Sequence, residues 1–289
     1  MTEHDLFQRF FFEDLGIRGE FVRLRDAWTG VRSDTDYPPL IASILGEALA
    51  ATVLLTGTLK FEGSLILQIQ GNGPVSTLVA QATHTLTVRG LAHWRTEPKS
   101  ASLMDLFGDG RMVLTIQQFQ QEPYQGIVAL EGDSLATAIE SYFSRSEQLP
   151  TRIWLFADGN TAAGLFIQAL PGKARSHEDW SRISHLADTL TRQEAFNLPS
   201  EELLYRLFHE ERVRVLEPEP VVFRCGCSRE RIESMLIAMG RDEAEASLDE
   251  HNEILVACEF CNRRYRFDRI DITRLFHPTV KVEQPSRLH

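Results

Sequence analysis

The four cysteines of the chain carry its clearest chemistry. Cys225 and Cys227 form a C-x-C pair, thirty residues follow, and Cys258 and Cys261 form a C-x-x-C pair. Two closely spaced thiolate pairs can supply the four tetrahedral ligands that structural zinc prefers. The spacing therefore predicts one zinc ion per chain, bound by all four thiolates.

The role of this zinc is left open by the spacing alone. A purely structural zinc ribbon fits it, and so does an oxidation-sensitive switch, because each pair is close enough in sequence to form its own disulfide. Nearby arginines would either keep the sulfurs in the thiolate form that oxidants attack or form a solvated face. They are Arg224, Arg263, Arg264 and Arg266. Stable disulfides are disfavoured, since nothing in the sequence indicates an oxidising compartment.

The residues around the cysteines indicate a small C-terminal module, residues 221–289. Residues 254–257 and 264–267 are expected to form a hairpin whose turn holds the C-x-x-C pair. An apolar helical stripe lies between the two cysteine pairs and ends at a glycine. It consists of Ile232, Met235, Leu236 and Met239, followed by Gly240. Because so small a module has little core, zinc ligation worth roughly 10–16 kcal/mol would dominate its stability.

Residues 1–172 are expected to form an N-terminal α+β domain of the α/β-sandwich type, with an antiparallel-rich sheet. Apolar positions from Pro39 to about Leu55 repeat at three or four, as in a core helix. Short β-branched and apolar segments separated by turn residues then predict strands, with one amphipathic helix near Leu135. The predicted strands span residues 64–70, 76–82, 85–94, 111–118, 126–130 and 152–156.

Residues 173–220 are expected to form a charged helical linker, because about a third of these positions are charged. One helix is predicted to start at Ser176, with Asp179 as its capping partner, and a second after Pro199. Isolated helices of about a dozen residues are marginal in water, so their order must come from docking onto a neighbouring domain. The linker is therefore predicted to be metastable.

Composition excludes several classes of function. The acidic N-terminal residues do not form an export signal, and the apolar segment 41–57 contains Glu47 and is too short to span a bilayer, so we expect a cytoplasmic protein without a membrane partner. A net charge of -11 opposes binding to nucleic acid. The sequence contains no P-loop, H-E-x-x-H, G-x-S-x-G or dinucleotide motif, so no enzyme is predicted.

Two other functions remain as alternatives. The first is a zinc-ribbon nucleic-acid-binding or regulatory factor, although residues 222–289 hold 11 basic and 12 acidic side chains and thus no positive excess. The second is a thiol oxidoreductase that uses Cys258 and Cys261, although the βαβ context typical of that motif is missing.

With these motifs the sequence resembles the bacterial redox-regulated holdase chaperones of the 33 kDa heat-shock family. Their signature is a C-x-C pair, an interval near thirty residues and a C-x-x-C pair, as found here. Residues 71–74 (GNGP), 124–128 (YQGIV) and 146–151 (SEQLPT) also look like family motifs. The resemblance covers nearly the whole chain.

The resemblance implies a function, a fold and a set of partners. It implies an ATP-independent chaperone that is inactive while reduced and zinc-bound, and that oxidation activates through zinc release and linker unfolding. By the same analogy the disulfides would join Cys225 to Cys227 and Cys258 to Cys261. The partners would be unfolded client proteins and, above all in the oxidised form, a second copy of the chain. The family fold, an N-terminal α/β domain, a helical linker and a C-terminal zinc domain, matches the three parts predicted here.

Overall fold

The computed structural model describes residues 5–58, 62–171, 176–248 and 250–276, which divide into two compact units. These units are Met1–Arg224 and Cys225–His289. Both mix helices with antiparallel strands, which confirms the predicted α+β class. We call residues 1–172 the body and residues 173–220 the linker. The predicted start of the linker at Lys173 lies outside the described residues, and the division into three parts remains a proposal.

Two sheets form the first unit, and their strands are almost all antiparallel. The first sheet has the order β10-β1-β2-β9-β8, with β11 also paired to β1. Its strands are β1 (Leu6–Phe12), β2 (Ile17–Leu24), β8 (Thr151–Ala157), β9 (Ala162–Ala169), β10 (Val213–Val215) and β11 (Glu219–Pro220). The second sheet has the order β12-β5-β4-β3-β6-β7, in which only the short β12 pairs in parallel. Its strands are β3 (Gly63–Gln70), β4 (Val75–Thr83), β5 (Thr87–Trp94), β6 (Arg111–Gln118), β7 (Tyr124–Ala129) and β12 (Val222–Phe223).

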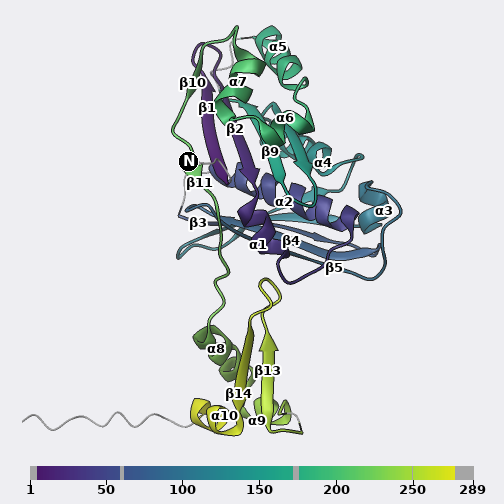
Figure 1. Cartoon of the computed structure of the whole chain (residues 1–289), viewed down its shortest axis with the longest axis vertical. Coiled ribbons are helices and arrows are strands. Elements are labelled where there is room, and N and C mark those ends of the chain that lie inside the picture. Colours follow the sequence, from purple (N-terminus) through teal and green to yellow (C-terminus); the bar gives the residue numbers. More distant parts are fainter. Residues whose placement is uncertain (1–4, 59–61, 172–175, 249, 277–289) are drawn as a thin grey trace, which may run out of the picture. The chain divides into compact units, whose positions relative to one another are not determined.

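The predicted core helix is α2 (Pro39–Gly57), which lies between the two sheets (Figure 1). Pro39 occupies its first position, where a missing N–H costs nothing. Among the described helices α2 is the one long and apolar enough to cross a membrane, but 78% of its apolar window is buried inside the protein. It is therefore a core helix. The remaining helices of the body are α1 (Asp26–Arg32), α3 (Leu103–Phe107), α4 (Leu135–Tyr142) and a π-helical turn, η1 (Phe143–Glu147).

The first sheet is buried on both faces. Side chains alternate along each strand, so Phe7 of β1 packs toward α2, whereas Phe10 and Phe12 pack toward the linker. The same alternation divides β9, whose eight residues are all buried. A sheet in the middle of three layers is therefore mostly apolar on both faces, and its few polar side chains, such as Gln8 and Glu20, are buried with it.

The linker contributes three short helices to the outer face of this sheet (Figure 1). They are α5 (His177–Ala187), α6 (Arg192–Asn197) and α7 (Ser200–Phe208). Ser176 accepts a hydrogen bond from the Asp179 N–H at the start of α5, as predicted. The helix after Pro199 is also confirmed, whereas α6 was not foreseen. Ile183, Leu203 and Phe208 are among the linker side chains that are buried against the sheet.

The second unit is small. It contains α8 (Arg229–Met239), α9 (Arg241–Ala246), the hairpin β13 (Glu253–Ala257) and β14 (Arg264–Asp268), and α10 (Arg269–Phe276). The predicted hairpin and the glycine that ends α8 are confirmed. The predicted apolar stripe of α8 is only partly internal, because Leu236 is buried while Met235 and Met239 are exposed.

Glu20, which is buried, and Glu47, which is partly buried, make the stability of the first unit depend on pH. Burial raises the pKa of Glu20 to about 7, against the opposing effect of Arg18 and Arg9. It raises the pKa of Glu47 on α2 to the same value, with the Ser43 hydroxyl and Arg192 opposing it. Both carboxyls bind protons more tightly in the folded state than in the unfolded state, so their contribution to stability is complete below the unfolded pKa near 4.5 and falls as pH rises through 7.

We expect Glu47→Gln to stabilise the first unit at pH 8 by up to about 3 kcal/mol and to flatten its stability between pH 5 and 8. The measurement is urea unfolding of wild type and variant at several pH values. Glu122→Gln, at an exposed position, is the control. Equal stabilities of Glu47→Gln and wild type at pH 8 would contradict the assignment.

Candidate metal centre

The two cysteine pairs lie on different elements of the second unit. Cys225 and Cys227 immediately precede α8, whose first turn is capped by the Ser228 hydroxyl. Cys258 and Cys261 lie in the turn of the β13–β14 hairpin. That turn closes through two backbone hydrogen bonds, from Cys258 N–H to the Arg263 carbonyl at 2.9 Å and from Asn262 N–H to the Cys258 carbonyl at 2.7 Å. The fold thus brings a helix start and a hairpin knuckle to the same place.

The four sulfurs form a compact cluster in which all Sγ atoms lie within 4.8 Å of one another. Two contacts join the pairs, 3.5 Å from Cys225 Sγ to Cys258 Sγ and 3.4 Å from Cys227 Sγ to Cys261 Sγ. A tetrahedral zinc with Zn–S bonds of about 2.3 Å separates its sulfurs by about 3.8 Å. The cluster therefore matches the donor type, number and spacing that zinc requires. All four cysteines are free thiols and partly exposed, so an oxidant can reach them.

A tyrosine hydroxyl contacts the sulfur cluster. The Tyr265 hydroxyl donates a hydrogen bond to Cys227 Sγ at 3.2 Å. Burial raises the pKa of Cys227, but this bond and those from the neighbouring thiols outweigh it and bring the pKa to about 7. Burial instead raises the pKa of Cys261 to about 12.

The arginines near the cysteines have different surroundings. The hydrogen bond with Tyr265 is the main cause that raises the pKa of the Arg263 guanidinium, and the charges of Cys227 and Cys261 add to it. Arg266 instead pairs with Glu253 at 3.3 Å. Arg231, which the sequence did not single out, donates to the Gly226 carbonyl at 2.8 Å and so holds the C-x-C loop.

The core around this site is very small. Within the described part of the second unit, its buried apolar side chains are Leu236, Ala244, Ile254, Phe267 and Ile272. Arg229 lies over the Phe267 ring, 4.3 Å from its centroid, and pairs with Asp271 at 2.8 Å. Five buried side chains supply little hydrophobic stabilisation, so a ligand that crosslinks the helix start to the hairpin would add much of the stability.

Comparison with known proteins decides the family. The family described as "Hsp33 protein" matches residues 5–268, which is most of the chain. The chain belongs to the Hsp33 family. A protein named 33 kDa chaperonin from Nitrosococcus oceani is 56% identical over 289 residues, covering all of both chains. Another of that name from Shewanella putrefaciens is 45% identical over 273 residues, which cover 94% of this chain and 96% of the relative.

A solved structure shows the same fold. The 33 kDa chaperonin of Thermotoga maritima superposes with a TM-score of 0.82 and covers 94% of this chain and 97% of its own, at 24% identity. The resemblance predicted from the cysteine spacing and the body motifs is thus confirmed, and the Hsp33 chain is a chaperone by family. Its relatives are named as chaperonins and not as enzymes.

Proposed function

We propose that this Hsp33 protein is an ATP-independent holdase controlled by a zinc-thiolate switch. In the reduced state one zinc ion on Cys225, Cys227, Cys258 and Cys261 keeps the chaperone inactive. Oxidation of the thiolates releases the metal and frees surfaces that bind unfolded proteins. The observation that supports this most is the cluster of four sulfurs within 4.8 Å of one another, on a unit whose described residues include five buried apolar side chains.

The oxidation is a two-electron step at each cysteine pair. When bound, zinc would supply a crosslink between the C-x-C loop and the hairpin knuckle. Two thiolates give two electrons to a peroxide and form one S–S bond, and the peroxide takes up two protons and leaves as two water molecules. We propose Cys225 with Cys227 and Cys258 with Cys261 as the bonded pairs. The sulfurs of a disulfide are no longer thiolate ligands, so the crosslink is lost.

The chain passes from the metal site to the linker through very short strands. Cys225 follows β12 by two residues, and β12, β11 and β10 have two, two and three residues. These strands hold residues 213–223 on β1 and β5. When the second unit unfolds, few backbone pairs anchor the segment that leads back to α7, so we propose that release spreads from there into the linker.

Undocking of the linker would expose a large apolar surface. The buried cluster between linker and sheet contains Phe10, Phe12 and Phe21 from the body, together with Leu203 and Phe208 from the linker. An exposed patch of this kind is the surface that a holdase needs for unfolded chains. A cytoplasmic location and a homodimer in the oxidised form are parts of the same proposal.

The test compares the reduced and the peroxide-treated protein. We expect the reduced, zinc-loaded chain to leave a denatured client to aggregate, and the oxidised chain to suppress aggregation as zinc appears in a chromogenic chelator. Equal activity in both states, or full activity with zinc retained, would refute the switch.

The Tyr265 hydroxyl gives a specific prediction about the metal. A ligand's hydrogen-bond partners typically change metal affinity by 10- to 100-fold, so we expect Tyr265→Phe to bind zinc about tenfold more weakly. Competition with a chromogenic chelator under reducing conditions measures this. The ring stays in place among the residues that pack against the small core, and Tyr205→Phe, at an exposed linker position, is the control. Unchanged affinity in Tyr265→Phe would mean that the hydroxyl contributes nothing to metal binding.

A further inference from the structure

The first two linker helices lack the basic side chains that normally stabilise a helix C-terminus. The last turn of α6 contains no basic residue, and that of α5 contains His185 alone. The C-terminal cap of α5 is Asp188, whose carboxylate lies where the helix dipole already places negative charge. The sequences of α5 and α6 therefore leave the negative charge at their C-terminal ends largely uncompensated.

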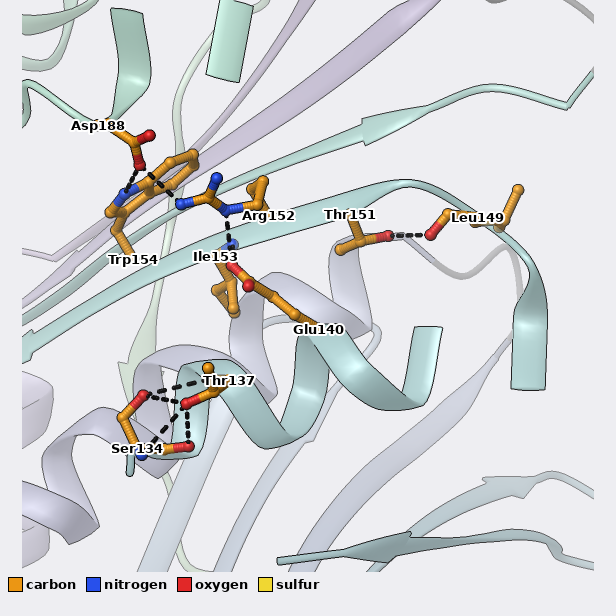
Figure 2. Close-up of polar contacts among 9 residues, drawn as sticks. All are labelled: Ser134, Thr137, Glu140, Leu149, Thr151, Arg152, Ile153, Trp154 and Asp188. Atoms are coloured by element: carbon orange, nitrogen blue, oxygen red, sulfur yellow. Dashed lines mark hydrogen bonds and ion pairs between the residues drawn. The ribbon is translucent and has the colours of Figure 1, made fainter. Parts of the chain in front are cut away.

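The body supplies the missing positive charge to α5 through Arg152 of β8. Figure 2 shows Arg152 between two carboxylates, Glu140 of the body and Asp188 of the linker. The Arg152 Nε atom donates to Glu140 at 3.1 Å, and a terminal nitrogen donates to Asp188 at 2.7 Å. The Trp154 indole N–H donates to the same Asp188 oxygen at 3.2 Å. At the end of a linker helix, Asp188 thus forms an ion pair with one strand side chain, Arg152, and accepts a neutral hydrogen bond from another, Trp154.

The position of Arg152 is fixed from the body side. Glu140 also accepts a hydrogen bond from the Ile153 N–H at 2.9 Å, which ties α4 to the edge of β8. The start of α4 is held by a capping box between Ser134 and Thr137, which is also drawn in Figure 2. The guanidinium therefore points at the site of Asp188 through contacts that belong to the body alone.

The body completes α6 in a similar way, with two arginines at the end of β2. Arg23, which is 2% exposed, donates to the carbonyls of Ala195, at 2.8 Å, and Leu198. Arg25 donates to the Phe196 carbonyl at 2.6 Å. These carbonyls lie at the C-terminal end of α6, where a helix leaves its last carbonyls without internal partners.

We propose that Arg152, Arg23 and Arg25 act as external C-terminal caps, so that α5 and α6 are electrostatically complete only while the linker is docked. This inference rests on the proposed release of the linker. It adds residues, far along the chain from the cysteines, that help to set how easily the linker is released. An undocked α5 carries Asp188 uncompensated, so docking and helix formation are coupled. The arginine contacts stabilise the docked linker directly and do not depend on whether the thiols are reduced or oxidised.

The experiment is hydrogen exchange on the full-length, reduced, zinc-loaded protein. We expect Arg152→Met to speed exchange of α5 amides by about fivefold or more, with zinc content unchanged. Asp188→Asn added to Arg152→Met should remove more than half of that increase, because it removes the uncompensated charge. Arg25→Met should speed exchange in α6. Arg145→Met is the matched control, since Arg145 pairs with Glu131 at 2.6 Å entirely within the body.

Two outcomes would overturn the proposal. One is wild-type exchange in α5 of Arg152→Met, and the other is a double variant that exchanges as fast as Arg152→Met. Because the readout is exchange in the reduced state, it is independent of client binding and of oxidation. If the oxidised protein fails to suppress aggregation but the variants show the expected hydrogen exchange, the proposed function is refuted and the proposal about the arginine caps is still supported.

Discussion

Cys258→Ser will leave the second unit unfolded in the reduced protein while the core of the body stays folded. Loss of one thiolate removes a ligand from a site whose metal contributes roughly 10–16 kcal/mol in comparable zinc modules. The five apolar side chains that are buried in the described part of this unit cannot replace such a contribution to stability. The expected result is loss of slow-exchanging amides across α8, β13 and β14, with zinc absent by elemental analysis.

A second variant in the same hairpin turn distinguishes loss of the metal from a local disturbance of the fold. Arg264 is exposed and begins β14, so Arg264→Gln should keep both zinc and slow exchange. Protection of β3, β4 and β6 should be the same in Cys258→Ser and wild type, because the second sheet and α2 share a core that does not include the linker. A reduced, metal-free Cys258→Ser protein whose hairpin still exchanges slowly would refute the role of zinc as the main stabiliser.

The metal site was predictable from sequence because its determinants are local. Two short cysteine motifs, a hairpin and a helix ended by Gly240 are each defined by a few consecutive residues. Tyr265 carried a weaker signal: it lies two residues before the buried Phe267 on the same face of β14. Its contact with Cys227 depends on how the hairpin meets the start of α8, and spacing does not reveal that.

The central sheet was the part of the fold that the sequence concealed. Strands β1, β2 and β9 were not predicted, because a sheet buried on both faces loses the alternation by which strands are recognised. The arginines that cap the linker helices were hidden for a related reason. Arg23 and Arg152 lie far along the chain from the carbonyls and the carboxylate that they bind, and single-sequence patterns report only near neighbours.

Phe208→Ala should release the linker without any oxidation. Phe208 is 1% exposed and lies at the end of α7, with its ring edge-on to Phe12 at 5.0 Å and tilted toward Phe10 at 5.8 Å. Truncating a buried phenylalanine typically costs 3–5 kcal/mol. Nearly all of this lost stability is lost by the docked state, because the Phe208 ring is exposed whenever α7 is undocked. A cost of about 3 kcal/mol raises the undocked population by about 150-fold.

The variant separates linker release from metal loss. We expect Phe208→Ala to suppress client aggregation while reduced and with its zinc retained, and to show fast exchange in α7 but normal protection of β3 and β4. Tyr205→Ala on the same helix, where the side chain is 69% exposed, should behave as wild type. An inactive Phe208→Ala protein with a fast-exchanging α7 would mean that undocking is not sufficient and that the second unit must also unfold. Activity with zinc retained would instead place the client-binding surface on the linker and the first sheet, with the thiolates acting only as the trigger.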